Sequence, residues 1–260
     1  MPSMLEVQNT GYPKTNVEPS RFIESFQKGE TPTFIKHVKA GLEALSGDPN
    51  ALLIFSGGPT KRLRTDLSEG ESYLKLAKDN NYYIQEAGAI STIDPARVIA
   101  EELATDSYQN VLFSLLRFRL HTGVYPQRIT IVTHEFKRAR FMECHFPAVG
   151  LLPQDETQAD NRASVIGINP PEEVTPLESL VLGEASKGIG LWRQDLYGVG
   201  KDLAGKRHRR GWYPGMEAEF FMHSGLEEVV ESLVCWDGGS GNEWFSRMTE
   251  LPWFYSNPTQ

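Results

Sequence analysis

Short apolar runs that alternate with apolar stripes of helical spacing are the feature that most constrains this fold. Residues 52–55 form a continuous apolar run, which is typical of a strand buried on both faces. The runs "RITIVT" at 128–133 and "ASVIGI" at 163–168 predict two further strands. Apolar residues recur at helical spacing over 34–45 and 111–116. This alternation favours an α/β fold, a Rossmann-like three-layer sandwich in which the three strands are neighbours in one mostly parallel sheet.

Local signals mark where helices begin and end. Thr31-Pro32 supplies a cap with proline at the first helical position. The stretch "SEGE" at 68–71 is a capping-box sequence. Either Asp106 or Ser107 caps a third helix, which the pair Thr122-Gly123 ends.

Three other segments are read from their spacing. The stretch "NYYIQE" at 81–86 predicts a short strand, and "HEFKRARFMECH" at 134–145 has helical spacing. Residues 95–103 fit a helix by spacing and a strand by context, so both assignments stay open.

The regularity of the strand and helix patterns divides the chain into three parts. Residues 1–20 are rich in Pro, Gly, Asn and Thr and predict a loose N-terminal arm rather than a short edge strand. Residues 21–170 hold the regular alternation and form the predicted core. Residues 171–260 are less regular, and we expect an irregular C-terminal elaboration packed on that core rather than a second domain.

The composition and the absence of known motifs argue against several classes of partner and cofactor. The 260-residue chain has a formal net charge of −8 and a pI near 5.4, so we expect no nucleic-acid partner. Without a targeting or spanning segment in the sequence we expect no membrane partner and a cytoplasmic location. The chain has only two cysteines, which are too few for a disulfide framework, so we expect both to be reduced thiols. A P-loop, a dinucleotide fingerprint and a G-x-S-x-G elbow are all absent from the sequence, so no cofactor is predicted.

Three loops are placed to form a ligand site. In open α/β sheets ligands bind at the carboxyl ends of the strands, beside helix N-termini. The loop Ser56-Gly57-Gly58 follows the first predicted strand, residues 102–110 lead into a helix, and Thr133-His134-Glu135 follows "RITIV". In a parallel sheet all three loops lie on one edge and converge.

The side chains of these loops suggest acid–base chemistry on a held ligand. We expect main-chain amides and short polar side chains to bind the ligand, with two cations as charged clamps. The expected substrate-binding residues are Ser56, Gly57, Gly58, Asp106, Ser107, Asn110, Thr133, Lys137 and Arg140. The acid–base candidates are Glu69, Glu102 and His134.

Each of these residues also has a purely structural interpretation. The two glycines suit a turn, His134 and Asp106 suit helix caps, and Lys137 with Arg140 suits a solvated helix face. No metal site is predicted, although Glu102, Asp106 and His134 would suffice to assemble one.

The expected exposure of each residue distinguishes those that would contact a ligand from those that only pack in the core. We expect Ser56 and Asn110 to be partly accessible at the cleft. The apolar residues Leu53, Val111, Leu115 and Val132 are expected to be buried.

Taken in order, these motifs resemble the DUF218 (YdcF/SanA/ElyC-like) family, and within it the eukaryotic, largely fungal branch. The likeness spans about 34–210 and is carried by "LLIFSGG" at 52–58 and by the segments 106–131, 136–145, 166–171 and 195–210. The resemblance implies a Rossmann-like fold with a polar cleft lined by the three loops, and it names no reaction.

The chain departs from that family's pattern in two places. Members usually open with a strand that ends in a small-residue loop, whereas this chain begins with "MLEVQNTGYP" at 4–13, without a glycine-histidine pair. His134 and Lys137 stand where bacterial members carry Ser and His, which puts the transfer of a catalytic histidine in doubt.

The sequence therefore favours an intracellular, metal-independent enzyme that acts on a small anionic or oxygenated molecule. Hydrolysis or transfer fits best, and a lyase or isomerase needs the same groups. The alternatives are a non-catalytic binder of a nucleotide-like ligand and a degenerate scaffold member of the family.

Overall fold

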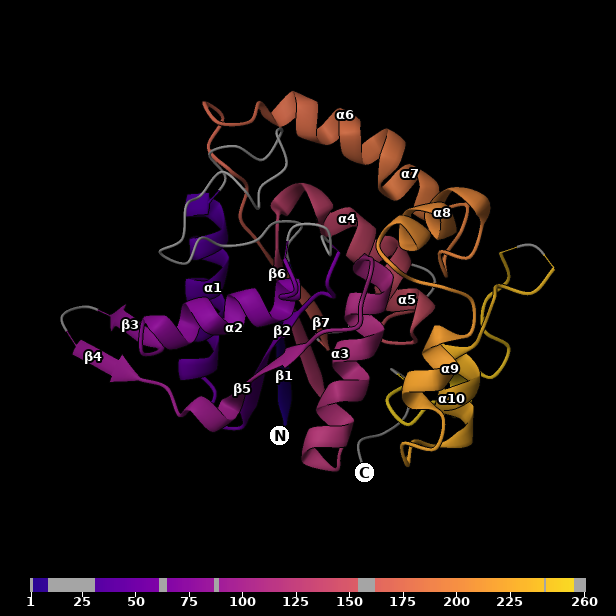
Figure 1. Ribbon diagram of the computed structural model, residues 1–260, viewed down its shortest axis with the longest axis horizontal. Coiled ribbons are helices and arrows are strands. Elements are labelled where there is room, and N and C mark those ends of the chain that lie inside the picture. Colours follow the sequence, from indigo (N-terminus) through magenta and orange to yellow (C-terminus); the bar gives the residue numbers. More distant parts are fainter. Residues whose placement is uncertain are drawn as a thin grey trace.

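The structure is a computed structural model, and it describes residues 2–8, 31–60, 65–86, 89–153, 162–240 and 242–254. Its centre is a five-stranded sheet in the order β5-β2-β1-β6-β7, with every neighbouring pair parallel (Figure 1). The strands are β1 (Ser3–Gln8), β2 (Ala51–Ser56), β5 (Val98–Glu101), β6 (Arg128–Thr133) and β7 (Ala163–Gly167). The predicted α/β fold with a parallel sheet is confirmed.

The N-terminal residues 3–8 form the central strand, so the prediction of a loose arm is wrong for them. β1 pairs with β2 on one side and with β6 on the other, and Met4 and Val7 are fully buried. β2 and β6 are consequently not direct neighbours, whereas β6 and β7 are. The polar Glu6 interrupts the short apolar run, so the strand's central place depends on its two partners and not on its own pattern. Residues 9–20 of the predicted arm lie outside the described residues.

Helices α1 (Thr31–Ser46) and α2 (Glu69–Asp79) cover one face of the sheet. Phe34, Val38, Leu42 and Leu45 of α1 recur at helical spacing and pack with the buried residues of β1 and β2. The hydroxyl of Ser68 caps α2 by accepting a hydrogen bond from the Glu71 amide at 2.9 Å, as the capping-box sequence predicts.

A small antiparallel hairpin stands apart from the main sheet. It consists of β3 (Tyr83–Glu86), which the stretch 81–86 predicts, and β4 (Ala89–Thr92). A 3₁₀ turn at Pro95–Arg97 then leads into β5, so the open assignment of 95–103 is settled in favour of a strand.

The long helix α3 (Ser107–Thr122) covers the other face of the sheet. The Asp106 carboxylate caps it by accepting a hydrogen bond from the main-chain N–H of Gln109 at 2.9 Å. Gly123 ends the helix in the left-handed conformation with φ 80°. The predicted helix after β6 is broken into short pieces. These are a 3₁₀ turn (Glu135–Lys137), α4 (Arg138–Arg140), a π-helical turn (Phe141–His145) and α5 (Phe146–Ala148).

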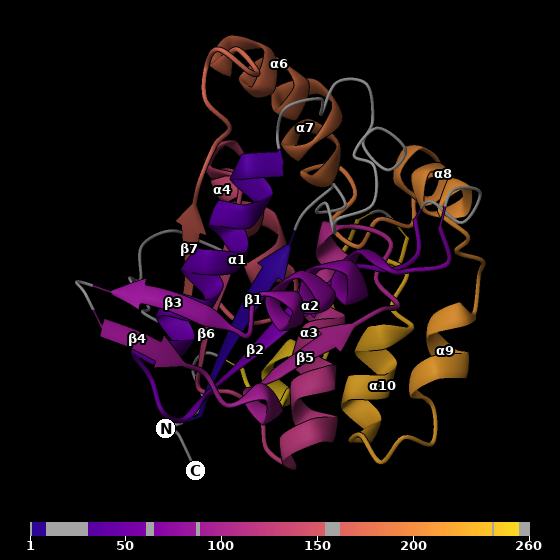
Figure 2. The ribbon, with the colours of Figure 1, turned by 60° about the vertical axis from the view of Figure 1, so that its left-hand side comes forward.

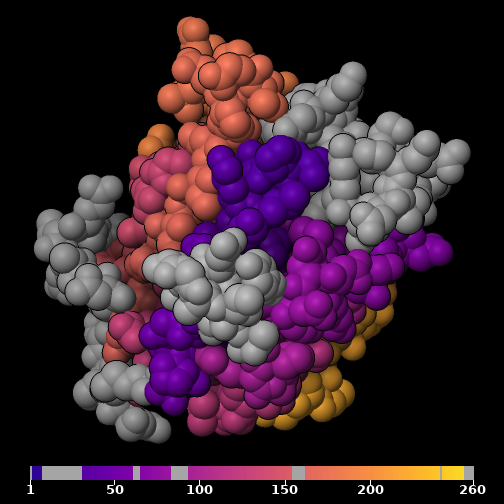
Figure 3. Space-filling view, turned by 90° about the vertical axis from the view of Figure 1, so that its left-hand side faces the viewer, coloured from indigo at the N-terminus to yellow at the C-terminus, as the bar shows by residue number. Residues whose placement is uncertain are grey.

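The chain after β7 first passes over the top of the molecule and then runs down the α3 side (Figure 2). It contains α6 (Leu177–Lys187), α7 (Ile189–Trp192), α8 (Lys201–Arg209), α9 (Met216–Phe221), α10 (Glu228–Val234) and a 3₁₀ turn (Met248–Glu250). Buried residues of α7 to α10 share one hydrophobic cluster with α3. By contrast α6 projects from the molecule (Figure 3), and its Leu177, Val181 and Leu182 are exposed. No helix in the described ranges combines the length and apolarity that crossing a bilayer requires.

Candidate functional site

Two of the three predicted loops meet at the carboxyl edge of the sheet. The amide of Gly57 donates to the Glu101 carbonyl at 3.0 Å, and the amide of Gly58 donates to the Ala104 carbonyl at 2.6 Å. The loop that starts with His134 leaves the same edge, but β1 stands between its strand and β2. Two strand spacings separate β2 from β6 by about 10 Å. The structure therefore joins the loops after β2 and β5 and sets the loop after β6 apart.

The glycine pair serves close packing. Gly57 has φ 146°, and a Cβ atom there would lie 2.8 Å from the Cβ of Glu69 in α2. A Cβ atom on Gly58 would lie 2.8 Å from the Ala104 carbonyl oxygen. Because both amides already donate within the protein, the expected anion cradle at these glycines has no free main-chain donor. The turn interpretation accounts for both residues.

A buried carboxylate, Glu101, lies under these loops. One of its oxygens accepts the Ser56 hydroxyl at 2.6 Å, and the other accepts the amides of Leu103 and Ala104. Burial raises the pKa of Glu101 to about 7 against the opposing effect of these hydrogen bonds, and the charge of Glu102 raises it further. Sequence reasoning missed Glu101, although as the last residue of its strand it pairs in register with Ser56.

The expected accessibility of two site residues is wrong. The exposed fraction is 0% for Ser56 and 8% for Asn110, because α3 packs over this end of the sheet. The burial expected of Leu53, Val111, Leu115 and Val132 is confirmed.

A cleft of about 290 Å³ opens beside the joined loops. Its polar lining residues are Asp66, Ser68, Glu71, Glu102, Thr105 and Arg210. Met216 and Phe220, one turn apart on α9, form its apolar wall. The C-terminal elaboration thus closes the cleft that the loops of the core begin.

The cleft is rich in carboxylates. Three of its lining side chains carry a carboxylate and one carries a guanidinium, that of Arg210. Arg210 donates to the main-chain carbonyl of Thr105. The Ser68 hydroxyl donates to the exposed Glu102 carboxylate at 3.1 Å. This excess of negative charge favours a neutral, hydroxyl-rich ligand over a free anion.

Glu69, the second predicted acid–base carboxylate, lies behind the glycine loop. It is 7% exposed, and its Oε1 accepts the Thr60 hydroxyl at 2.6 Å. It does not line the cleft.

The predicted residues at the end of β6 and just after it are buried beside a second histidine, His37. Thr133, His134 and Lys137 are at most 7% exposed, and the rings of His134 and His37 lie 4.9 Å apart. The Nε2 atom of His37 lies 2.8 Å from the Ile168 carbonyl oxygen. Burial lowers the pKa of His37 to about 4 and holds that of His134 well below its usual range, and the charge of Lys137 lowers both further. Both histidines are therefore neutral near pH 7.

The two remaining charged candidates are held in buried ion pairs. Arg140 pairs with Glu184 of α6, and Asp106 pairs with Arg207 of α8. Both contacts tie the C-terminal helices to the core, so neither residue stands as an unpaired ligand clamp.

Ser107 lies beside one of these pairs. Arg140 donates to its hydroxyl at 3.2 Å, and its Oγ lies 2.8 Å from the Nε2 atom of His145. His145 was not among the predicted residues, because its place in the π-helical turn gives no motif.

A metal site at Glu102, Asp106 and His134 is not formed. Across the described part of the chain, no three His, Cys, Asp or Glu side chains are grouped as metal ligands.

In a comparison with known proteins, this chain is similar to the uncharacterized protein YOR238W of Saccharomyces cerevisiae. The two sequences are 25% identical over 206 residues that cover 68% of each chain. No family model matches the chain, and the resemblance to DUF218 stays a prediction. No solved structure matches it either.

Proposed function

We propose that the protein is an enzyme that uses acid–base chemistry on a small, oxygen-rich substrate in the cleft between the β2 and β5 loops. The observation that carries this proposal is the pair of adjacent carboxylates at the end of β5. Glu102 is exposed in the cleft, while Glu101 behind it is buried and has a pKa of about 7. Neighbouring carboxyl groups in such different environments are typical of acid–base sites.

Glu102 is the group that exchanges a proton with the substrate. Its carboxylate accepts the Ser68 hydroxyl, which orients it toward the cleft, and it lies in the cleft with two more carboxylates, Asp66 and Glu71. A pair of carboxylates on either side of a reacting bond supports hydrolysis or transfer at a glycosyl centre. Glu101 acts indirectly, because it holds the amides of the loop that presents Glu102.

The charge balance of the cleft supports an oxygen-rich substrate over an anionic one. With three carboxylates against one arginine, a bare anion is repelled, whereas a polyhydroxylated molecule finds many hydrogen-bond acceptors. Met216 and Phe220 offer an apolar surface on which a sugar ring or similar body packs.

The test begins with ligand discovery on the full chain. A thermal-shift panel of neutral sugars, sugar phosphates, nucleotides and acyl acids identifies stabilising ligands, and each is then assayed for turnover. We expect stabilisation by neutral sugars rather than by phosphates. Glu102→Gln should lower turnover by about 100-fold or more with little change in ligand affinity, because a proton is needed only on the way to the transition state.

Glu173→Gln is the matched control, because it removes the same charge from an exposed residue that does not line the cleft. If a stabilising ligand is found but is never turned over, and Glu102→Gln weakens its binding, the enzyme proposal fails. A non-catalytic binder then replaces it.

A further inference from the structure

Helix α6 and the turn before it present four large apolar side chains to solvent. The exposed fractions are 47% for Leu177, 50% for Val181 and 62% for Leu182, and Val174 just before the helix is 37% exposed. All four lie close together in the sequence, on or beside a helix that projects from the molecule (Figure 3). Single exposed apolar residues are ordinary on a protein surface, whereas a contiguous group of them marks an interaction site.

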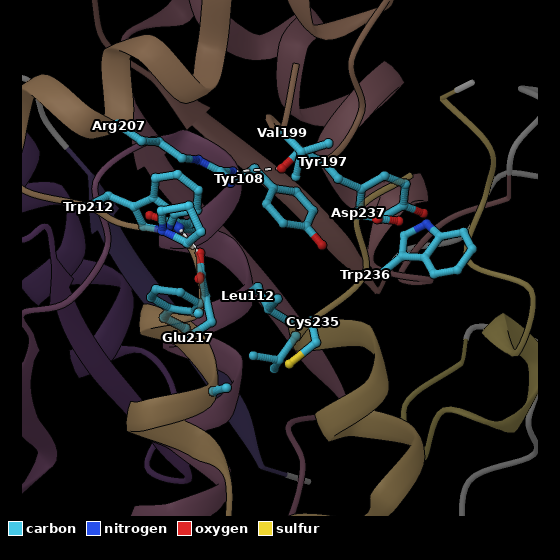
Figure 4. Close-up of a pocket in the computed structure, with 16 residues that line it drawn as sticks. Tyr108, Leu112, Tyr197, Val199, Arg207, Trp212, Glu217, Cys235, Trp236 and Asp237 are labelled. Atoms are coloured by element: carbon cyan, nitrogen blue, oxygen red, sulfur yellow. Dashed lines mark hydrogen bonds between the residues drawn. The ribbon is translucent and has the colours of Figure 1, made fainter. Parts of the chain in front are cut away.

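The other helices that follow β7 bury apolar side chains inside the protein. Around the cavity beside α9, residues of α3 and of the C-terminal segments turn toward one another (Figure 4). Leu112 and Tyr197 there are each 1% exposed, and the rings of Tyr108 and Tyr197 have centroids 5.6 Å apart. No residue of α6 belongs to either hydrophobic cluster of the described residues, so its apolar side chains have no counterpart in this part of the chain.

One buried side chain anchors α6 to the core. Glu184, near the C-terminal end of the helix, is the only buried residue of α6. It pairs with Arg140 and accepts the main-chain N–H of Ile189 at 3.0 Å. The helix has 11 residues and begins without a side-chain cap, and a helix of this length is only marginally stable by itself in water. A partner packed along its apolar side would therefore stabilise it.

The exposed face of α6 consists of Leu177, Glu178, Val181 and Leu182. Leu177 and Val181 lie one turn apart, and Glu178 and Leu182 form the row beside them. Glu178 is exposed and forms no ion pair with any described residue, whereas Glu184 is neutralised by Arg140. Lys187 is the only cation of the helix, and it follows Glu178 by about two and a half turns, so it lies on the opposite side. The exposed face is thus apolar with one unpaired negative charge.

This arrangement disfavours two kinds of occupant. A second copy of the chain would set two such faces together and leave both Glu178 carboxylates without a cation, because Lys187 lies on the other side of the helix. A membrane surface is negatively charged and attracts helices whose polar side is rich in Lys and Arg. An occupant that supplies apolar side chains together with a cation fits the face instead.

We propose that the exposed face of α6 is a docking surface for a basic amphipathic helix of another protein. Apolar side chains of that helix cover Leu177, Val181 and Leu182, as ridges of one helix pack into the grooves of another. A lysine or arginine at the edge of its apolar stripe pairs with Glu178, which fixes the orientation of the partner.

The test compares two model helices by isothermal titration calorimetry on the full chain. One peptide contains leucines on one face and lysines on the other, and the second replaces every lysine with glutamate. We expect the leucine–lysine peptide to bind at least about tenfold more tightly. Equal affinities, or no binding of the leucine–lysine peptide, would overturn the proposal.

Paired variants then locate the binding, because the net charge of −8 attracts a basic peptide to the whole surface. Val181→Gln combined with Leu182→Gln should weaken the leucine–lysine peptide by about tenfold. The matched control is Leu120→Gln with Val124→Gln, which changes two side chains of 42% and 50% exposure at the far end of α3 and should leave the affinity unchanged. An equal loss in the control would overturn the assignment to α6.

A single charge and the oligomeric state complete the test. Glu178→Gln should weaken the leucine–lysine peptide by about threefold, whereas Glu219→Gln, at an exposed position of α9, should have no effect. Equal effects of these two substitutions would show that the whole net charge, and not Glu178, attracts the peptide. Sedimentation of the unmodified protein should show a monomer. A dimer that the Val181 and Leu182 substitutions dissociate would show that a second copy occupies the face and would overturn the proposal.

Discussion

The buried carboxyl of Glu101 makes the stability of this protein depend on pH in a way that one substitution should remove. Glu101→Gln keeps the size of the side chain and all three hydrogen bonds. The amide oxygen still accepts the Leu103 and Ala104 amides, and the amide nitrogen donates to the Ser56 hydroxyl oxygen. What the substitution removes is the ability of this position to ionise.

The expected size follows from the pKa of this carboxyl in the folded and unfolded chain. It is 4.5 in the reference state and about 7 when buried, so the folded protein holds the proton more tightly. Stability is therefore fully present below pH 4.5 and falls as the pH rises toward 7. At about 1.4 kcal/mol per pH unit, the contribution lost across this window is about 3 kcal/mol.

Urea denaturation of both proteins at a series of pH values measures the effect. The difference in unfolding free energy between the original protein and the Gln variant should shift by about 3 kcal/mol in favour of the variant between pH 4.5 and pH 8, because the other titrating groups cancel. A difference that stays constant with pH would show that Glu101 ionises normally and would refute the reasoning about its burial.

Two further predictions concern a close packing contact at Gly70 and the ion pair between Arg207 and Asp106. In Gly70→Ala the new Cβ would lie 2.5 Å from main-chain oxygens of both β2 and β5, so we expect a loss of about 2 kcal/mol, whereas Gly183→Ala in α6 meets nothing within 4 Å and should gain up to about 1 kcal/mol. Equal effects of the two substitutions in urea denaturation would contradict this packing. Arg207→Met leaves the Asp106 carboxylate without its partner at 11% exposure and should cost about 3–5 kcal/mol in the same assay. Adding Asp106→Asn should restore part of the loss, and a single variant as stable as the parent would show that the pair contributes nothing.

Most of the fold follows from local signals. The run 51–56 is apolar at nearly every position, and the caps Ser68 and Asp106 lie directly before helices that begin where the sequence predicts. Such signals are readable because apolar periodicity and capping depend on neighbours within one or two turns. β1 was missed because its burial depends on two strands that lie more than 40 and 120 residues away in the chain.

The site was predicted less completely than the fold. From the sequence alone, the parallel alternation placed Gly57, Glu102 and His134 on one edge of the sheet, because parallel strands share the direction of their carboxyl ends.

Only the tertiary structure decided which of these groups meet. β1 lies between β2 and β6 and so separates the His134 loop from the loops after β2 and β5. Arg140 forms an ion pair with Glu184. Arg210 and α9 of the C-terminal elaboration complete the cleft around Glu102. The state of Glu101 was also decided there, since its pKa depends on burial by segments far along the chain. A sequence pattern records the polarity of a residue, whereas strand order, ion pairing and desolvation arise from contacts between distant segments.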